Sequence, residues 1–482
     1  MSPLAITIGD VMNQPMEEKM AFRFVFAKHR ADLFLANDRR NARRVRLAIV
    51  LAAVAWPLAG LARTEFGASQ RTADATVGCM FPLAGRAAIY GRDSIAGMKL
   101  ALADLAAKLP PGTAPKLRIL VEDDRSKASV ATRIAENFIT RDKARFLCGV
   151  VSSGVAQAVS RVSRARRVIM IGTDHASSRL TIEDFHRHYF RVSNDTYTSM
   201  AAGARYLADL QKRNGWRRLA FIGPDYDYGH IAWRDLEDAM AIHGVRYVMA
   251  GHYWPRLYEP DYTAHIAELK AANPDVIVTA LWGGDFIAFL KQALSADLLE
   301  KAKLANFDTG GNFDVLVSLG ETVPGGLILS ARHHNNWPET ARNRKFVDDF
   351  HRMEGRYPTY AAEGAYAGIM VIGQALVLAG KQASNEQLIR VLEGLHMSLP
   401  EDPAGYVSHI DPETHQIIQA QAIGEVVPNT AFPPARVMLG HWVAYRAEDL
   451  QPSLDLIRAR RARAGNNTSS IHVAPVPLTT TH

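Results

Sequence analysis

Residues 146–171 read FLCGVVSSGVAQAVSRVSRARRVIMI, and this stretch holds the unit from which the rest of the chain is built. Two short apolar runs, Phe146–Val151 and Val168–Ile171, are separated by a small-residue turn and a helical segment. Nearly continuous apolar strands are typical of parallel sheets that are covered on both faces. A helix that connects two such strands predicts a right-handed βαβ crossover.

The same alternation extends in both directions from this stretch. Before it, the pattern predicts strands at Thr76–Phe81 and Leu117–Glu122, with helices at Ser94–Leu109 and Ser129–Thr140. A second alternation follows Tyr189–Val192, with predicted helices at 199–213, 230–243, 261–273 and 285–299 and strands at 218–223, 245–252, 275–281 and 303–307. We therefore expect an α/β fold with two doubly wound lobes.

The pattern changes after residue 326. One strand at 326–331 precedes three helical segments, and three strand-like segments follow them, so that the predicted elements are helices at 338–354, 360–380 and 384–395 and strands at 404–410, 415–424 and 437–445. The last residues contain many Asn, Thr, Ser and Pro and no Lys, Arg, Asp or Glu after residue 463, so we expect a disordered tail over 458–482.

Composition places the chain among ordinary soluble proteins. It has 482 residues, of which 48% are hydrophobic and 22% charged, which predicts two or three domains. The net charge of +7 is concentrated at two ends that look dispensable, residues 1–62 and the run Arg458–Arg463. A protein that reads nucleic acid carries its basic residues on a folded face, so we expect no nucleic-acid partner.

The N-terminal region has the three-part pattern of a secretory signal. Five arginines between Arg39 and Arg46 precede the uncharged apolar run Leu47–Ala62, which ends in Gly60-Leu61-Ala62. The run has 16 residues and contains Pro57, whereas a membrane-spanning helix needs about 20 apolar residues. We expect residues 1–62 to be an N-terminal extension and signal, cleavage near Arg63 and a periplasmic location; an uncleaved anchor is the alternative.

Cysteine and histidine spacing indicates neither a metal site nor a catalytic centre. Cys79 and Cys148 both lie in predicted strands, where two buried thiols are favoured and a disulfide is the alternative. The pairs His186/His188 and His333/His334 have no acid or Cys ligand beside them. Known nucleotide-binding, hydrolase and zinc-protease motifs are absent from the sequence, so we expect a protein that is not an enzyme and needs no cofactor.

Polar and aromatic residues follow the predicted strands where open α/β sheets bind ligands, beyond their carboxyl ends. Ser152-Ser153-Gly154 opens a helix, and free N–H groups at a helix N-terminus favour an anion. Each such loop also has an ordinary explanation as a cap, a turn or a packing contact. The loops are Tyr90-Gly91, Ser152–Gly154, 172–177, 226–229, 282–285 and 308–312.

The order of these features resembles the type I periplasmic solute-binding proteins, the leucine/isoleucine/valine-binding group that serves ABC importers. The resemblance covers residues 73–445 and rests on PLAG, YGRD and GMKLA early in the chain, then on SSG, YFR, DYDYG and Asp275–Thr279 with Trp282. It implies two lobes joined by three crossovers that close on a ligand. The lobes would be 73–192 plus 330–425 and 193–329 plus 426–450, with hinges near Arg191–Asn194 and Leu329–Ala331.

The resemblance also implies roles for particular residues. Ser153, with Ser152 beside it, matches the group that holds a ligand carboxylate, and Asp308 lies where an acid pairs with the ligand ammonium. Ala176 stands where the family has a threonine that helps bind the ammonium, so that half of the site is only partly present. The full predicted set is Tyr90, Ser152, Ser153, Asp174, His175, Ala176, Tyr228, Trp282, Asp308 and Glu363.

The function that the resemblance implies is capture of a small carboxylate ligand for an ABC transporter permease. An α-amino acid is the first expectation. The alternatives are an aromatic or aliphatic acid, an amide, or a role as a ligand-sensing receptor module.

Overall fold

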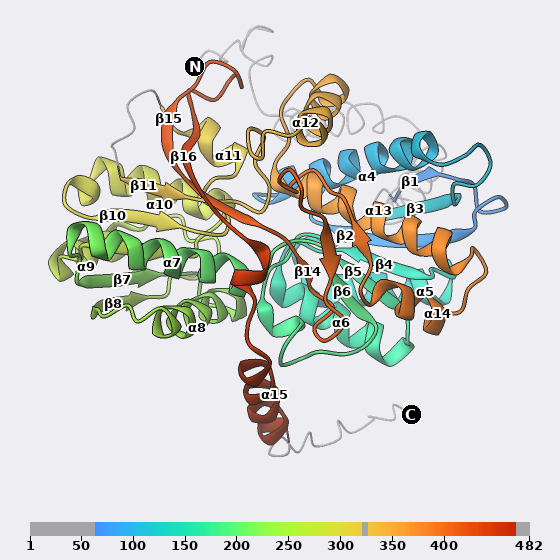
Figure 1. Cartoon of the computed structure of the whole chain (residues 1–482), viewed down its shortest axis with the longest axis horizontal. Helices are drawn as coiled ribbons and strands as arrows, with labels where there is room; N and C mark the ends of the chain where they lie inside the picture. The colour runs from blue at the N-terminus through green and yellow to red at the C-terminus, as the bar shows by residue number, and fades with distance from the viewer. Residues whose placement is uncertain (1–62, 321–325, 469–482) are drawn as a thin grey trace, which may run out of the picture. The chain divides into compact units, whose positions relative to one another are not determined.

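The computed structural model describes residues 63–320 and 326–468 (Figure 1). The predicted extension and signal at 1–62 and the last residues, 469–482, lie outside the described residues. Two sheets of mostly parallel strands, each with helices packed against it, form two lobes, and the predicted fold class is confirmed.

The first sheet contains the stretch FLCGVV and belongs to lobe 1. Its edge strand is antiparallel to its neighbour, and the other strands run parallel. In spatial order the strands are β1 (Thr64–Gly67), β3 (Leu117–Asp123), β2 (Ala75–Phe81), β4 (Phe146–Gly149), β5 (Ile169–Gly172) and β6 (Tyr189–Arg191). The helices of this lobe are α4 (Ala88–Lys108), α5 (Ala128–Thr140), α6 (Ser153–Arg166), α12 (Ala341–Glu354), α13 (Tyr360–Ala379) and α14 (Asn385–Leu392).

The second sheet has five parallel strands and an antiparallel pair at one edge. In spatial order they are β16 (Val437–Tyr445), β15 (Gln421–Pro428), β11 (Leu327–Leu329), β10 (Lys303–Asn306), β9 (Val276–Thr279), β7 (Arg218–Ile222) and β8 (Val248–Tyr253). The helices of lobe 2 are α7 (Thr196–Asn214), α8 (Asp227–Ile242), α9 (Thr263–Ala272), α10 (Gly283–Ser295) and α11 (Phe313–Ser318).

One predicted strand is divided between the lobes. The segment expected at 415–424 forms β14 (Ile417–Ile418), which pairs with β13 (Ser408–Ile410) of a small sheet that also contains β12 (His396–Met397), and then β15 of the second sheet. The predicted lobe boundary between residues 425 and 426 therefore falls inside β15. The chain crosses between the lobes at Gln419 and Ala420.

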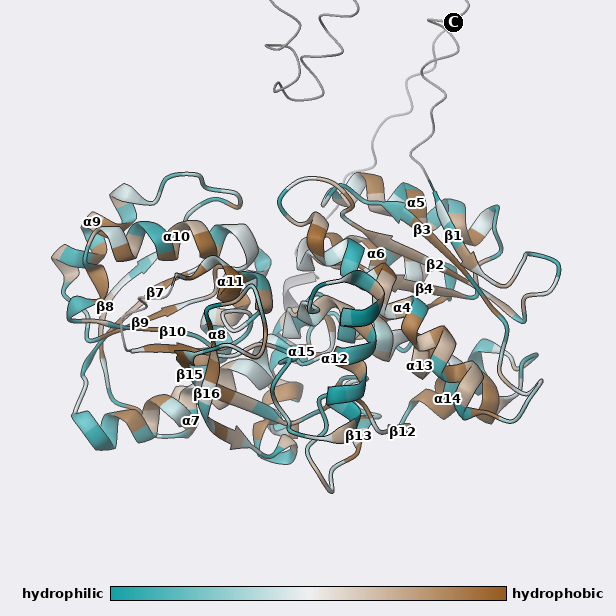
Figure 2. Ribbon diagram, turned by 90° about the horizontal axis from the view of Figure 1, so that it is seen from above, coloured by the Kyte–Doolittle hydropathy of each residue, from teal (hydrophilic) through white to brown (hydrophobic). Residues whose placement is uncertain are grey.

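The core of lobe 1 depends on a close crossing of α4 and α13. A side chain at Gly97 would place its Cβ 1.9 Å from the carbonyl oxygen of Ala362, so only glycine permits this approach. Among the described helices, α13 alone is long and apolar enough to cross a membrane, but 83% of its most apolar stretch is buried within the protein. Figure 2 shows hydrophobic residues along the strands of the sheets, whereas α12 is largely hydrophilic.

Cys79 and Cys148 are directly opposite each other on the neighbouring strands β2 and β4. Both are buried free thiols, and Cys79 Sγ lies 3.7 Å from the sulfur of Met98. The structure therefore agrees with the favoured expectation of two buried thiols.

A helix replaces the predicted disordered tail as far as Thr468. This helix, α15 (Leu454–Thr468), includes the basic run Arg458–Arg463, which sequence composition had suggested was dispensable. The side chain of Arg460 is 1% exposed and pairs with Asp235 at 2.7 Å and Asp238 at 2.5 Å on α8. Composition could not reveal these partners, because they lie more than 220 residues away in the chain.

A buried hydrogen-bond network ties the three crossovers together. Gln421, which begins β15, accepts a hydrogen bond from Asn194 Nδ2 at 2.6 Å and donates one to the hydroxyl of Ser330 at 2.6 Å. Asn194 lies on the first crossover, between β6 and α7, and Ser330 on the second, directly after β11. All three side chains are buried, and Asn194 and Ser330 also donate to the backbone carbonyl oxygens of Ala420 and Ala422 beside Gln421.

Two buried glutamates, Glu363 of α13 and Glu401, interact with each other inside lobe 1. Burial raises the pKa of Glu363 to about 7, against the effect of a hydrogen bond from Glu401. Burial together with the charge of Glu363 raises the pKa of Glu401 well above its ordinary range. Glu401 therefore stays protonated at neutral pH, and Glu363 is the member of the pair that titrates there.

We predict that Gln421→Met lowers the free energy of unfolding by about 1–3 kcal/mol. Methionine has a similar length but removes the buried hydrogen bonds to Asn194 and Ser330, which then keep only their contacts with the carbonyl oxygens of Ala420 and Ala422. Urea denaturation measures the change. Gln451→Met is the control, since Gln451 is partly exposed and donates only to the backbone of Ala447. Equal losses in the two variants would contradict a special role for the crossover network.

We predict that Glu363→Gln becomes more stabilising, relative to the wild type, as pH rises from 5 to 8. Folding raises the pKa of Glu363 from 4.5 to about 7. Its contribution to stability is therefore complete below pH 4.5 and is lost as pH rises through 7, whereas glutamine carries no such proton. The stability difference between variant and wild type should change by on the order of 1–3 kcal/mol over this range.

Measuring that difference by denaturation at each pH removes the contribution of other groups. His175, whose pKa burial lowers to about 3, acts with the opposite sign in both proteins, because its contribution is lost as pH falls below 6.5. A difference that does not change with pH would show that Glu363 is already ionised in the folded protein.

Candidate functional site

The carboxyl ends of strands from both sheets meet at one cleft. Ser153 begins α6 directly beyond β4, and Asp174 follows β5 by two residues. From lobe 2, Trp282 precedes α10, and Asp308 and Thr309 follow β10. The parallel order of the strands brings these loops to the same edges, as the sequence analysis expected.

The cleft is closed around its own side chains. The space between them is only about 10 Å³, roughly the volume that one water probe needs, whereas ligand pockets typically occupy about 300–1,000 Å³. Entry of a ligand therefore requires the lobes or these side chains to move. The lining residues are Val151, Ser153, Asp174, Ala176, Tyr226, Tyr228, Trp282, Thr309, Arg332 and Tyr360.

Five of the ten predicted site residues line this space, and the other five lie elsewhere. The lining residues are Ser153, Asp174, Ala176, Tyr228 and Trp282. Asp308 contacts two residues of the lining, Arg332 and Tyr228, from behind. Ser152 occupies the N-cap position of α6, and Glu363 meets Glu401 inside lobe 1.

His175 is part of the lobe 1 core. Its Nδ1 lies 2.9 Å from the carbonyl oxygen of Val150 and its Nε2 lies 2.7 Å from the hydroxyl of Tyr189. Burial, with a smaller effect from the charge of Arg191, lowers its pKa to about 3. It is therefore a neutral histidine with both ring nitrogens engaged by protein groups.

Asp308 is fully engaged by protein donors. It accepts hydrogen bonds from Ser199 at 3.0 Å, from Tyr228 at 2.7 Å, and from Nε and Nη2 of Arg332 at 3.0 and 2.6 Å. Burial disfavours its charge, but the Arg332 guanidinium and these hydrogen bonds outweigh that effect and lower the pKa of Asp308. It is thus a carboxylate whose countercharge comes from the protein.

Arg332 is the main site residue that the sequence analysis missed. It is buried, its Nη1 donates to the carbonyl oxygen of Asp174, and its guanidinium lies 4.7 Å from the ring centre of Tyr360. Contacts with described residues use three of its five N–H groups, which leaves two for a ligand. Its position just after the strand predicted at 326–331 is a sequence signal for a site residue, whereas the neighbouring His333 and His334 have the more conspicuous pattern.

Two polar groups of the cleft have no hydrogen-bond partner among the described residues. They are the carboxyl group of Asp174 and the hydroxyl group of Thr309. Burial raises the pKa of Asp174 to about 7, although the charge of Arg332 opposes the shift. Because buried polar groups are normally paired, both are free to bind a ligand.

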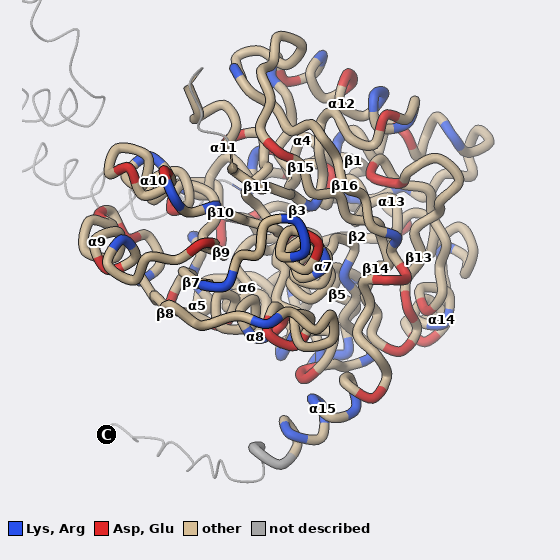
Figure 3. Tube along the Cα trace, turned by 60° about the vertical axis from the view of Figure 1, so that its left-hand side comes forward, with Lys and Arg blue, Asp and Glu red and all other residues tan. Residues whose placement is uncertain are grey.

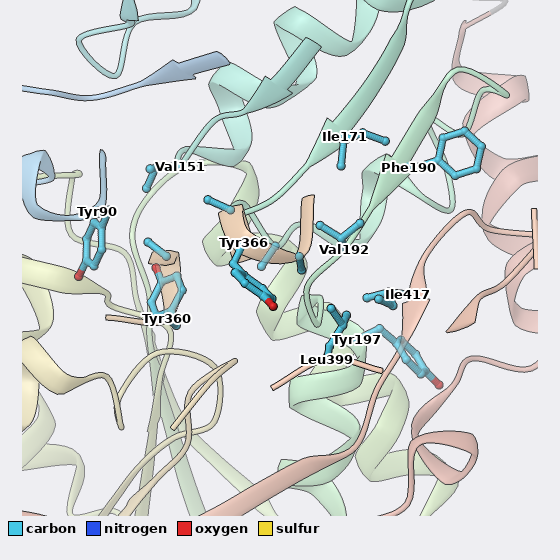
Figure 4. Packing of buried hydrophobic residues seen from close by; sticks show 14 of the residues in the cluster. Tyr90, Val151, Ile171, Phe190, Val192, Tyr197, Tyr360, Tyr366, Leu399 and Ile417 are labelled. Atoms are coloured by element: carbon cyan, nitrogen blue, oxygen red, sulfur yellow. The ribbon is translucent and has the colours of Figure 1, made fainter. Parts of the chain in front are cut away.

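Aromatic rings form the walls of the cleft. The indole N–H of Trp282 donates to the hydroxyl of Tyr226 at 3.1 Å, and both residues line the space. Tyr90 lies behind the wall, where its ring stacks on Tyr360 with centres 5.5 Å apart (Figure 4). The Tyr90 hydroxyl also donates to Asp314 of α11 at 2.9 Å, so this ring spans the boundary between the lobes.

The first turn of α6 supplies the predicted anion-binding feature. Its opening N–H groups have no acceptor within the helix, and the hydroxyl of Ser153 accepts a hydrogen bond from the backbone N–H of Ser177 at 3.2 Å. Ser153 therefore stabilises the neighbouring loop and also faces the cleft.

In both histidine pairs noted in the sequence, a ring nitrogen is hydrogen-bonded to another side chain of the protein. His186 Nε2 lies 2.8 Å from the hydroxyl of Ser160, and His333 Nε2 lies 2.8 Å from Oδ1 of Asn343. Within residues 63–320 and 326–468, no three His, Cys, Asp or Glu side chains are grouped as a metal ion would require.

Comparison with known proteins agrees with this geometry. Residues 74–431 match the family model of the periplasmic binding proteins. A Leu/Ile/Val-binding protein homolog of Brucella melitensis is 24% identical over 258 residues, which cover 52% of this chain and 58% of that protein. The chain thus aligns with little more than half the length of that relative.

Two solved structures share the fold. A solute-binding protein of an ABC transporter from Rhodopseudomonas palustris, in complex with 3,4-dihydroxybenzoic acid, superposes with a TM-score of 0.67 at 22% identity and covers 77% of this chain and 97% of its own. An amino acid ABC transporter substrate-binding protein from Pseudomonas fluorescens has a TM-score of 0.67 at 23% identity, over 80% and 98% of the two chains.

The matched family consists of binding proteins, in agreement with the expectation that this chain is not an enzyme. The match covers most of the chain and includes the three segments that connect the lobes. The chain therefore belongs to the periplasmic binding protein family and has its two-lobed type I fold.

Proposed function

We propose that this chain is the solute-binding protein of an ABC importer and that it captures an aromatic carboxylate without an amine between its lobes. The observation that carries the ligand class is the Arg332–Asp308 ion pair. It supplies the countercharge of Asp308 from the protein, where the first expectation had a ligand ammonium.

Electrostatics favours an acid over an amino acid at this position. An ammonium bound to Asp308 would lie within about 4–5 Å of the Arg332 guanidinium, and two like charges at 4 Å repel by about 4 kcal/mol at an effective dielectric constant of 20. A carboxylate would instead accept the two remaining N–H groups of Arg332 and face the N-terminus of α6.

The walls of the cleft support an aromatic ligand. Tyr226, Trp282 and Tyr360 give flat apolar surfaces on which a ring can stack. The unpaired groups of Asp174 and Thr309 suit a hydroxyl substituent on that ring. The Rhodopseudomonas protein with the same fold was solved with a hydroxylated benzoic acid, which is consistent with this ligand class.

An α-amino acid is the second candidate, because Asp174 offers a carboxyl group without a partner. In that case Asp174, rather than Asp308, would pair with the ammonium. The Pseudomonas fluorescens protein of the same fold is an amino acid ABC transporter substrate-binding protein. Variants at the two aspartates separate the candidates.

In this function the protein is exported to the periplasm and delivers its ligand to a permease, as expected of this family. Arg63, the first residue that the structure describes, pairs with Glu122 at 2.8 Å and with Asp142 at 2.7 Å. A mature chain that begins there would enter β1 directly, with its first side chain held on the first sheet.

We predict that benzoate and 4-hydroxybenzoate raise the melting temperature and that benzamide and leucine do not, because only the acids supply a carboxylate without an ammonium. Removal of the ion pair by Arg332→Gln together with Asp308→Asn should weaken benzoate binding by about 30-fold or more, the usual cost of losing a buried charged contact. Calorimetry measures the affinities, and the double substitution avoids leaving one buried charge alone.

Arg205→Gln is the control for that experiment, because Arg205 is a partly exposed arginine of lobe 2 that pairs with Asp449. Wild-type benzoate affinity in the double variant would contradict the proposed role of Arg332. Tight leucine binding that Asp174→Asn abolishes would establish the amino-acid alternative instead.

We predict that the exported protein begins at or near Arg63 when it is expressed in a Gram-negative host. The small residues at Gly60 and Ala62 fit the specificity of signal peptidase, and the apolar run is short for a membrane span. N-terminal sequencing of the periplasmic fraction tests this. An intact N-terminus in the membrane fraction would favour the uncleaved anchor.

A further inference from the structure

A second cavity lies at the boundary between the lobes and shares no lining residue with the cleft. Its volume is about 910 Å³. Its walls come from α6 and residues 179–186 of lobe 1, from α8 of lobe 2, and from the C-terminal helix α15. The cavity is therefore large enough for a small molecule, and both lobes contribute to it.

Arginine dominates the lining of this cavity. Lobe 1 contributes Arg161, Arg164 and Arg179, and lobe 2 contributes Arg234. The remaining three come from α15, along which Figure 3 shows the basic residues at intervals. Only three carboxylates, Glu183, Asp184 and Asp238, share the lining with these seven arginines.

Each of those carboxylates is already paired. Glu183 pairs with Arg234 across the lobe boundary, Asp184 pairs with Arg179 at 2.9 Å, and Asp238 pairs with Arg460 at 2.5 Å. Three further carboxylates from outside the lining pair with these arginines: Asp227 with Arg179, Asp235 with Arg460 and Glu413 with Arg461. These six carboxylates contact four of the seven arginines, Arg179, Arg234, Arg460 and Arg461.

Three arginines remain without a carboxylate partner among the described residues: Arg161, Arg164 and Arg463. Arg161 and Arg164 are three positions apart on α6, so they project from the same face of the helix. Arg463 lies on α15, a different wall of the same cavity. All three side chains are solvent-exposed, and together they present guanidinium groups on two walls of one cavity.

The cavity has a rigid frame, because α15 is anchored to both lobes. Arg460 binds α8 of lobe 2 and packs over the ring of Tyr197 at 5.6 Å. The next residue, Arg461, binds Glu413 and the carbonyl oxygen of Ile182 in lobe 1 and packs over Phe185 at 4.5 Å. These contacts hold the basic helix against the boundary between the lobes.

We propose that this cavity binds a multivalent oxyanion of the phosphate type. Several phosphate oxygens can accept hydrogen bonds from guanidinium groups on different walls at once, as a single carboxylate cannot. Because arginines of both lobes line the cavity, the bound anion stabilises the arrangement in which the lobes lie together. The site is independent of the ligand class proposed for the cleft.

Calorimetry of the full chain with inorganic tripolyphosphate at low ionic strength tests the proposal. We expect saturable binding to one site, weakened about tenfold or more by Arg161→Gln with Arg164→Gln and also weakened by Arg463→Gln. The control pair Arg133→Gln with Arg141→Gln removes the same charge from equally exposed positions at α5 that do not line the cavity, and it should bind like the wild type. Unchanged melting temperatures establish that the variants are folded.

Two outcomes would overturn the proposal: no saturable binding, or equal weakening in the control pair, which would indicate only diffuse attraction to a basic surface. Sedimentation with phosphatidylglycerol vesicles, against phosphatidylcholine vesicles, identifies the source of the phosphate group. Vesicle binding that depends on Arg161 and Arg164 assigns a lipid headgroup, and tripolyphosphate binding without it assigns a soluble anion.

Discussion

The hydrogen bonds of Gln421 are the constraint on which the two-lobed structure depends. This side chain joins Asn194 of the first crossover to Ser330 of the second, and it begins the strand that completes the third. The three segments are separated by more than 90 residues in the chain, yet they share one buried network. A buried amide that loses its partner costs free energy, so the three crossovers are held together as one unit.

A short backbone segment connects the cleft to this network. Arg332 lies two residues beyond Ser330, and its guanidinium binds Asp308 and the backbone of Asp174, one from each lobe. A ligand that binds Arg332 therefore contacts a side chain only two residues away from the second crossover. This is the physical route by which occupancy of the cleft can be coupled to the position of the lobes.

Ion pairs also join the two lobes around the second cavity. Cross-lobe ion pairs there join Arg179 to Asp227 and Arg234 to Glu183, while α15 contributes its own arginines. In the cleft the charges are balanced by one ion pair, whereas the second cavity keeps three arginines without carboxylate partners among the described residues. The two faces of the boundary thus differ in what they can bind, although the same lobes form both.

By itself, the sequence determined the α/β alternation, the two lobes and the edge of each sheet at which polar residues gather. These follow from local periodicity, and the structure brings Ser153, Asp174 and Trp282 together in the lining of one cleft. Tertiary structure alone decided which groups pair. Asp308 was expected to face a ligand, and in the structure it binds Arg332. Arg460 was assigned to a disordered tail, whereas it is buried against α8. The strand expected at 415–424 is divided between the lobes. The physical reason is that hydrophobic spacing reports which face of an element is buried, whereas the partner of a buried charge is set by packing between segments far apart in the chain.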